Sequence, residues 1–400
     1  MPPVPRRVLP CPVEIIFAIL EAGCHIHDLQ QDTQFLLNAS LVSRSWSLPA
    51  QMLLFRHVII RSQAAFIALR NATSSNEMRG NDLARHVRSL SVTLDPGQPG
   101  CLQTHSFSYA VSWFPNLKSL DLAFYSSSKA TPSYQSDSKP FLFLKDEEIS
   151  ILRSGPIITV LRLSNWSGDR SLLDRFLTLY NSSLRTLALR GTPFSFPAPT
   201  TSLSATPLHP LHLTLEPPLA PALLDWLTNP AVRPHLRALE FTRQPHHVAL
   251  AALLSAHGDS LAALALPMLT TADAALVAAH TRFRLEALRM EHPYAALPPQ
   301  RAHLRLRQAA LAPGPALALV RREIRARRAA GDDIDIDGSA SGGGGRLQHL
   351  SVMLWRGHED EPGVVRALRL ACAQLGVCLE FERDVRAFRT LFWAGVVQRG

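Results

Sequence analysis

Leucine and other apolar residues recur along most of this 400-residue chain in one short pattern, apolar-x-x-Leu-x-apolar. The pattern first appears at Val87, Leu90 and Val92, and eight further copies follow. Most neighbouring central leucines lie 24 to 30 residues apart, a spacing typical of repeats built from one strand and one return segment. Because the last two apolar positions are two residues apart, both face the same core in a strand. The central leucines are Leu90, Leu120, Leu161, Leu187, Leu211, Leu239, Leu264, Leu288 and Leu350.

Helix-like segments alternate with these strands, at residues 170–180, 220–227, 248–257 and 272–280. Alternation of strands and helices favours parallel strands joined by right-handed returns. The sequence therefore predicts an α/β fold, in which all-α N-terminal helices precede a solenoid with a parallel sheet.

Composition changes along the chain predict its domain boundaries. The Pro/Ser-rich stretch 125–140 is too polar to pack and is expected to be a mobile loop. Four glycines at 342–345 are typical of a flexible tether, and the surrounding insertion is expected to contain no strand. The expected parts are 1–8 (disordered N-terminus), 9–62 (helical module), 63–84 (connecting helix or linker), 85–295 (solenoid), 296–345 (Arg-rich and Gly-rich insertion) and 346–400 (final repeat and C-terminal cap).

The N-terminal module has more apolar residues than its size can bury. Val13, Ile16 and Leu20 fall on one side of a predicted helix, and Ile15 and Ile19 fall on an adjacent side. A unit of this size buries only about 60 % of its unfolded surface, so a module this apolar usually needs a partner or an attached domain. We interpret it as a docking element; the alternative is a helical cap on the domain that follows.

Two segments of this module, the run Pro-Val-Glu-Ile-Ile from Pro12 and Leu-Val-Ser-Arg-Ser-Trp from Leu41 to Trp46, resemble the fungal type of F-box. Proteins of that family bind a Skp-type adaptor of SCF ubiquitin ligases. The family usually has Leu before the proline, where this chain has Cys11, and the link at residues 23–33 is long. The resemblance implies adaptor contacts at Pro12, Ile15, Ile16, Ile19, Leu20, Leu36, Leu37, Leu41, Val42 and Trp46.

The repeats resemble degenerate leucine-rich repeats. That family tends to place Asn or Cys three residues after the third apolar position, and this chain has neither there. The alternative is a generic leucine-rich α/β domain. Strand residues beside the inward leucines would face a concave target-binding surface, or they are ordinary solvated strand residues. They are Asp121, Arg162, Arg190, Glu240, Thr242, Arg289 and Glu291.

Charge and cysteine content narrow the possible partners and cellular locations of the protein. The net charge is +9, and residues 301–330 alone hold eight Arg and one Glu. The Arg-rich run 321–328 is either a nuclear import signal, a contact for an acidic partner, or a solvated helix face. Five scattered cysteines suit a reducing compartment, so we expect a cytoplasmic or nuclear protein. No apolar run approaches the roughly 20 residues of a membrane span.

Signatures of catalysis are missing from the sequence. It has no Gly-rich phosphate loop and no Gly-x-Ser-x-Gly nucleophile elbow. Cys24, His25, His27 and Asp28 are metal-ligand types, yet no second ligand pair accompanies them, so a solvated loop is the favoured interpretation. We expect no cofactor, no metal and no enzyme activity.

The resemblance implies a substrate-receptor subunit of an SCF-type cullin–RING ubiquitin ligase. Its partners would be a Skp-type adaptor, the cullin–RING subunits that the adaptor brings, and an unknown protein target. The alternative is a leucine-rich-repeat scaffold without a ligase role. A nucleic-acid binder acting through the Arg-rich segment is less favoured, and no membrane association is expected.

Overall fold

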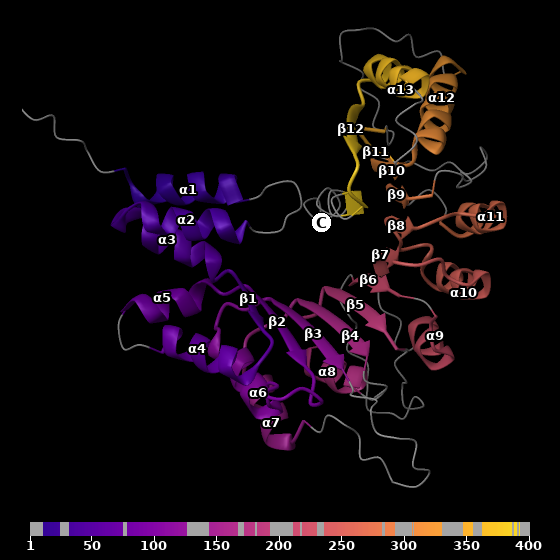
Figure 1. Ribbon diagram of the computed structural model, residues 1–400. Helices are drawn as coiled ribbons and strands as arrows, with labels where there is room; N and C mark the ends of the chain where they lie inside the picture. The colour runs from indigo at the N-terminus through magenta and orange to yellow at the C-terminus, as the bar shows by residue number, and fades with distance from the viewer. Residues whose placement is uncertain are drawn as a thin grey trace, which may run out of the picture. The chain divides into compact units, whose positions relative to one another are not determined.

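The computed structural model describes residues 11–24, 32–74, 78–125, 144–166, 172–180, 182–192, 211–216, 218–229, 236–281, 285–292, 306, 308–329, 347–354, 362–385, 388–389 and 392 (Figure 1). The chain forms two compact units. The first comprises Met1–Leu122 and Phe143–Ile157, and the second comprises Ala123–Leu142 and Ile158–Gly400.

The first unit begins with three helices, before strands and helices start to alternate. Its elements are α1 (Val13–Cys24), α2 (Thr33–Val42), α3 (Arg44–Leu54), β1 (His57–Ile60), α4 (Gln63–Thr73), α5 (Met78–His86), β2 (Ser89–Leu94), α6 (Thr104–Trp113), β3 (Ser119–Tyr125) and α7 (Asp146–Arg153).

The second unit continues the alternation of strand and helix. Its elements are β4 (Val160–Trp166), α8 (Leu172–Tyr180), β5 (Thr186–Gly191), β6 (Leu211–Leu215), α9 (Pro221–Thr228), β7 (Leu236–Phe241), α10 (His247–His257), β8 (Ala263–Leu266), α11 (Thr271–His280), β9 (Ala287–Met290), β10 (Gln308–Leu311), α12 (Pro313–Ala329), β11 (His349–Met353), α13 (Pro362–Leu375) and β12 (Cys378–Glu382).

The strands follow one another in sequence order, from β1 to β3 and from β4 to β12. Pairs such as β1–β2, β4–β5 and β8–β9 are parallel. In Figure 1 helices α9, α10 and α11 lie to one side of strands β7 to β9. The predicted fold class is confirmed: N-terminal helices precede a leucine-rich-repeat-like solenoid with a parallel sheet.

One central residue from each of these repeats, leucine in all but one, forms a ladder in the core of its unit. Leu161 pairs in register with Leu187 across β4 and β5, and Leu264 pairs with Leu288 across β8 and β9. All of these side chains are fully buried, so stacking the repeats buries a row that no single repeat could bury alone. The central residues are Leu90 and Leu120 in the first unit, and Leu161, Leu187, Leu213, Leu239, Leu264, Leu288, Ala309 and Leu350 in the second.

At strand β6 the predicted register is wrong by two residues. The sequence pattern placed Leu211 at the central position, whereas Leu213 pairs with both Leu187 and Leu239. A register irregularity between Leu211 and His212 accompanies the shift. Because leucine stands at 211, 213 and 215 alike, the period-2 pattern fits either register.

The prediction that residues 300–345 contain no strand is also wrong. Strand β10 pairs with β9 through Ala309 and Leu288, and with β11 through Ala309 and Leu350. Helix α12 follows it directly, so this stretch contributes a complete strand and helix. The leucine pattern misses this repeat because Ala309 takes the central place. Of the expected loop at 125–140, Tyr125 is the last residue of β3 and the rest lies outside the described residues. The glycine tether and the expected disordered N-terminus also lie outside them.

Side-chain bonds to the backbone link neighbouring repeats near the strand ends, and Gln244 stands where the family's asparagine would. The Gln244 amide accepts a hydrogen bond from Met268 N at 3.2 Å, and the Glu216 carboxylate accepts one from Gly191 N at 3.2 Å. Before two of the strands, Ser183 and Ser260 donate to carbonyls of the preceding repeat at 2.7 and 2.9 Å. These bonds stabilise the turns without an asparagine ladder.

Within the described part of the chain, we find no helix with the length and apolar character needed to cross a bilayer.

Candidate functional site

The three N-terminal helices form a small apolar core of their own. Ile16 and Leu20 of α1 meet Leu36 of α2 and Leu53 of α3, and all four side chains are at most 2 % exposed. Contacts of α3 with both α1 and α2 close the module. This core uses only one side of α1 and one side of α2.

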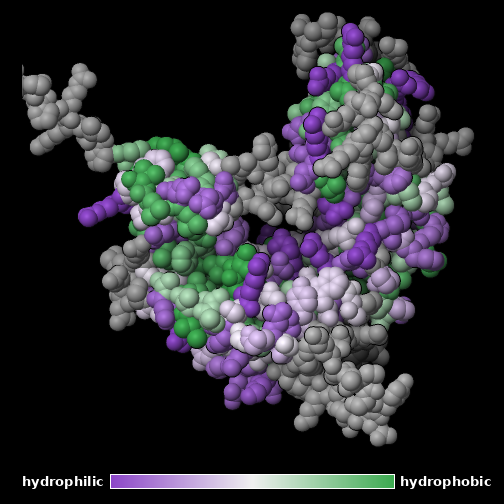
Figure 2. Space-filling view, viewed as in Figure 1, coloured by the Kyte–Doolittle hydropathy of each residue, from purple (hydrophilic) through white to green (hydrophobic). Residues whose placement is uncertain are grey.

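The other sides of the same two helices carry apolar residues that face solvent. Two pairs, Ile15/Ile19 on α1 and Leu37/Leu41 on α2, have the four-residue spacing that puts both members on one helix face. Leu41 is 84 % exposed and Ile15 is 52 % exposed. Figure 2 shows hydrophobic side chains gathered over these helices. The exposed apolar surface consists of Pro12, Val13, Ile15, Ile19, Leu37, Leu41 and Val42.

Only part of the predicted adaptor-binding set lies on this surface. Pro12, Ile15, Ile19, Leu37, Leu41 and Val42 are all exposed. The rest of the set belongs to the module's own core. There, Ile16, Leu20 and Leu36 are fully buried and so are not available to a partner, whereas Trp46 is half-buried against that core.

Val13 is a surface residue that the predicted set omitted. Its spacing to Ile16 and Leu20 suggested a core position, but it is 52 % exposed because it is the first residue of α1, beyond the reach of the helices below. In the sequence, the position of Val13 directly after Pro12 was the feature that could have predicted its exposure.

Polar contacts fix the helices that present the apolar surface. The Asp32 carboxylate caps α2 by accepting a hydrogen bond from Phe35 N at 2.8 Å. Asp32 N in turn donates to Cys24 O at 3.0 Å, which joins the end of α1 to the start of α2. Arg56 and Glu21 form an ion pair at 2.6 Å. The apolar surface therefore rests on helices with defined ends.

Cys24 does not have the properties of a free metal ligand. Its side chain is 1 % exposed, and burial raises the pKa of the thiol. A raised pKa leaves the neutral thiol as the dominant form, whereas metals bind the thiolate. His25, His27 and Asp28, the other members of the suspected cluster, lie outside the described residues.

A second group of ligand-type side chains lies on the last two strands. The ligand atoms of His349, Cys378 and Glu380 fall within 4.8 Å of one another, and His349 is register partner of Cys378. His349 Nε2 lies 3.8 Å from Glu380 Oε1, an ordinary cross-strand ion pair when the histidine is protonated. We assign these residues no metal, and the sequence pattern gave no sign of the group.

The predicted target-binding residues differ widely in exposure. Arg190 is exposed, and Asp121, in the first unit, is half-buried; Arg162 and Thr242 are half-buried as well. The remaining three are buried, contrary to the expected solvated surface. Their exposed fractions are 7 % for Glu240, 0 % for Arg289 and 5 % for Glu291.

These three buried residues form one charged network. Arg289 Nη2 donates to Glu240 Oε1 at 2.8 Å and lies 3.2 Å from Glu291 Oε1. Thr214 Oγ1 donates to the second oxygen of Glu240 at 3.0 Å, and Arg389 from the C-terminal segment binds Glu291. Two carboxylates thus balance two guanidinium groups on the strand face opposite helices α9 to α11.

The network shifts the pKa of one carboxyl group and of one guanidinium group in opposite directions. Burial alone would raise the pKa of Glu240, yet His212 and the Arg289 charge hold that pKa well below the usual carboxyl range. Hydrogen bonding to Glu291 raises the pKa of Arg389. Glu240 is therefore ionised at neutral pH because of the groups around it.

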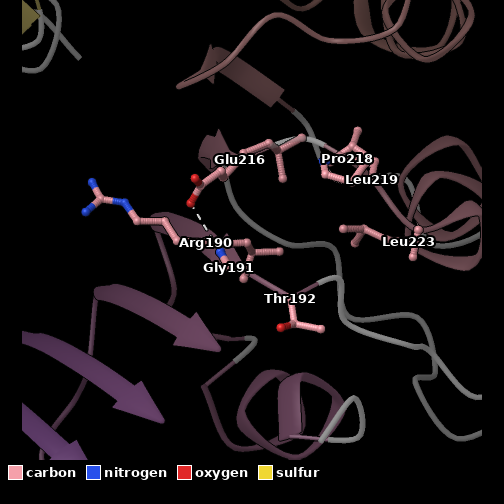
Figure 3. A pocket seen from close by; sticks show the side chains of 10 residues that line it. Arg190, Gly191, Thr192, Glu216, Pro218, Leu219 and Leu223 are labelled. Atoms are coloured by element: carbon pink, nitrogen blue, oxygen red, sulfur yellow. Dashed lines mark hydrogen bonds between the residues drawn. The ribbon is translucent and has the colours of Figure 1, made fainter. Parts of the chain in front are cut away.

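A shallow recess lies at the ends of strands β5 and β6 (Figure 3). Its lining includes Gly191, Thr192 and Glu216, with Leu219 and Leu223 from the α9 side. Its volume of about 240 Å³ includes space open to solvent, and sites for small molecules usually start at roughly 300 Å³. The recess therefore does not support a substrate site.

No protein-family model matches this sequence, and no curated protein matches it. Among solved structures, the chain is similar to one in the "Crystal structure of Rad7 and Elc1 complex in yeast". That match has 15 % sequence identity and a TM-score of 0.36, and it covers 85 % of this chain and 87 % of the other. A similarity this distant carries no argument about function.

Proposed function

We propose that this chain is a non-catalytic substrate receptor of an SCF-type cullin–RING ubiquitin ligase. Helices α1 and α2 bind a Skp-type adaptor, and the repeat strands bind a target protein. The single observation that carries the proposal is the exposed apolar surface of α1 and α2, which coincides with the F-box-like sequence runs.

Energetics favour covering this surface. Full burial of one Val, Leu or Ile side chain contributes about 1.5–3 kcal/mol, and the surface offers six such side chains besides Pro12. Large apolar side chains clustered on one face are typical of protein interaction sites. The module keeps a complete core of its own, so the surface residues serve no folding role that the structure reveals.

The chain would act by holding the target protein close to the ubiquitin-loaded enzyme. Binding adaptor and target at once raises the effective concentration of target lysines near the ubiquitin-loaded enzyme. All five cysteines are free thiols, which supports a cytoplasmic or nuclear location.

Co-purification of the full chain with a Skp-type adaptor tests this function. A stable complex that also recruits a cullin–RING pair supports it. A chain that binds proteins through its repeats, yet leaves the adaptor in the flow-through, would instead be a repeat scaffold with no ligase role.

A further inference from the structure

The described C-terminal residues Val385, Phe388, Arg389 and Phe392 lie on the strand face opposite helices α9 to α11. Phe388 and Phe392 are both fully buried there, and Val385 packs beside them. Their neighbours are five alanines from strands β7 to β10 and one methionine from β11. They are Ala238, Ala263, Ala265, Ala287, Ala310 and Met353.

This alanine floor differs from an ordinary solvated strand face, where polar side chains alternate with core residues. Ala263 and Ala265 flank Leu264, whose side chain enters the core, so the two methyl groups point to the opposite side. Short side chains in neighbouring strands leave depth for an aromatic ring above the sheet. We call this floor and its rim, Glu291 and Gln308, the alanine groove.

Polar contacts hold the segment at the rim of the alanine groove. Arg389 donates Nε to Glu291 Oε1 at 2.8 Å and Nη2 to Glu291 Oε2 at 2.7 Å, a bidentate pair. Gln308 Nε2 donates to Phe392 O at 3.1 Å. The guanidinium of Arg289 lies 5.7 Å from the centre of the Phe392 ring, within reach of a cation–π contact.

The spacing of the contacting residues is that of one helix face. Val385, Phe388, Arg389 and Phe392 stand at i, i+3, i+4 and i+7, and Phe388 N donates to Asp384 O at 2.9 Å, a helical bond. Amphipathic helices that bind grooves use this spacing for their anchors. Two aromatic anchors and one arginine are the residue types that dominate binding energy at protein interfaces.

We propose that the alanine groove is a peptide-binding site and that the C-terminal segment occupies it as an internal competitor. The ligand in trans is an amphipathic helix of a partner protein, with two aromatic side chains one turn apart and an arginine beside them for Glu291. This inference rests on the proposed function only in treating the repeat strands as the target surface.

Because the C-terminal segment is covalently linked to the alanine groove, it can control the access of other peptides to this groove. A segment linked to its own site acts at an effective concentration of about a millimolar. A free peptide with micromolar intrinsic affinity is therefore excluded while the segment is bound. Release of the segment exposes the groove.

Binding of a labelled synthetic peptide, residues 383–394 of this chain, to the full-length protein tests the inference by fluorescence anisotropy. The test variant is F388A/R389A/F392A, which removes the internal anchors. The matched control is R366A, an exposed arginine on α13. A second peptide with alanine at both phenylalanine positions controls for nonspecific binding.

We expect the triple variant to bind the native peptide on the order of 100-fold more tightly than wild type or R366A does. The peptide with alanine at both phenylalanine positions should bind neither the triple variant nor wild type. If the folded triple variant binds the native peptide no more tightly than wild type does, or does not bind it, the inference is wrong. If the triple variant folds only when the native peptide is present, the groove accepts the segment in trans and the inference is supported. If the peptide does not restore folding, the segment is a permanent part of the core and the inference is wrong. No adaptor enters this assay, so its outcome is independent of the ligase proposal.

Discussion

Arg289 reaches Glu240 across an intervening strand: its Nη2 lies 2.8 Å from Glu240 Oε1, although β8 separates β9 from β7. The register explains this contact, because Glu240 pairs with Ala265 and Ala265 pairs with Arg289. The methyl group of Ala265 leaves room for the guanidinium to pass above it. A small residue in one repeat therefore permits an ion pair between the two repeats beside it.

Loss of Arg289 should destabilise the protein strongly. R289M removes the guanidinium that donates a hydrogen bond to buried Glu240. Breaking a buried pair in this way costs about 3–5 kcal/mol. R243M is the matched control, because Arg243 pairs with Glu216 at 3.0 Å but its side chain is 68 % exposed. Removal of such a surface pair should cost at most about 1 kcal/mol. Urea denaturation followed by circular dichroism measures both, and equal losses would contradict the assigned role.

Glu240 should make stability depend on pH in acid. Its pKa in the folded chain is lowered from the ordinary 4.5, so the unfolded chain binds the proton first as the pH falls. The stabilisation is therefore fully present above about pH 4.5 and is lost as the pH falls toward the lowered pKa. E240Q, whose amide does not titrate, should show a smaller loss of unfolding free energy between about pH 5 and 3 than wild type. Parallel curves for the two proteins would exclude Glu240 as the source.

Gly191 should not tolerate a side chain. Its φ is +85°, and an added Cβ would stand 2.2 Å from Asn165 O of the neighbouring strand. G191A should cost about 1–3 kcal/mol, because the left-handed backbone and the contact both oppose it. Gly363 in α13 is the control, since a Cβ there meets nothing within 4 Å. G363A should be neutral or slightly stabilising by differential scanning calorimetry, and a similar loss for both variants would be the contrary result.

The repeat formed by β10 and α12 should be essential for folding. Leu311 is fully buried, and L311A should cost about 2–5 kcal/mol through the lost contacts and the cavity. R321A, at an exposed position on α12, provides the control and should leave the melting temperature almost unchanged. An unaffected L311A variant would mean that this segment is dispensable.

The sequence predicted the leucine ladder well, because a buried leucine at a period of 24 to 30 residues leaves few alternatives for the fold. The prediction failed where the leucine pattern fitted two registers or where a repeat had no leucine at its central position. Three leucines at alternate positions left the β6 register open, and Ala309 hid the β10 repeat. Both errors have the same cause: a pattern of residue types does not contain the lateral pairing that chooses between registers.

The candidate sites show the same limit. Helical spacing placed Ile15 and Ile19 on a face distinct from Ile16 and Leu20, and the structure exposes the first pair and buries the second. Sequence alone gave no means of knowing that Glu240, Arg289 and Glu291 would be covered, because the residues that cover them lie about 100 to 150 positions later in the chain. Such long-range contacts leave no local pattern.

Titration of a purified Skp-type adaptor into the full chain, followed by isothermal calorimetry, tests the central claim most directly. The variant I15A/I19A removes two exposed side chains of α1 that the module core does not use. Ile15 is 52 % and Ile19 is 47 % exposed, so burying both contributes about half of the 1.5–3 kcal/mol that full burial of each would give. We therefore expect affinity to fall about 10- to 150-fold. The control V248A/L370A removes two comparably exposed apolar side chains, 63 % and 59 %, from the second unit and should bind like wild type. Binding by wild type that I15A/I19A loses and V248A/L370A keeps is the predicted result; undiminished binding by I15A/I19A, or no binding by wild type, would contradict the account.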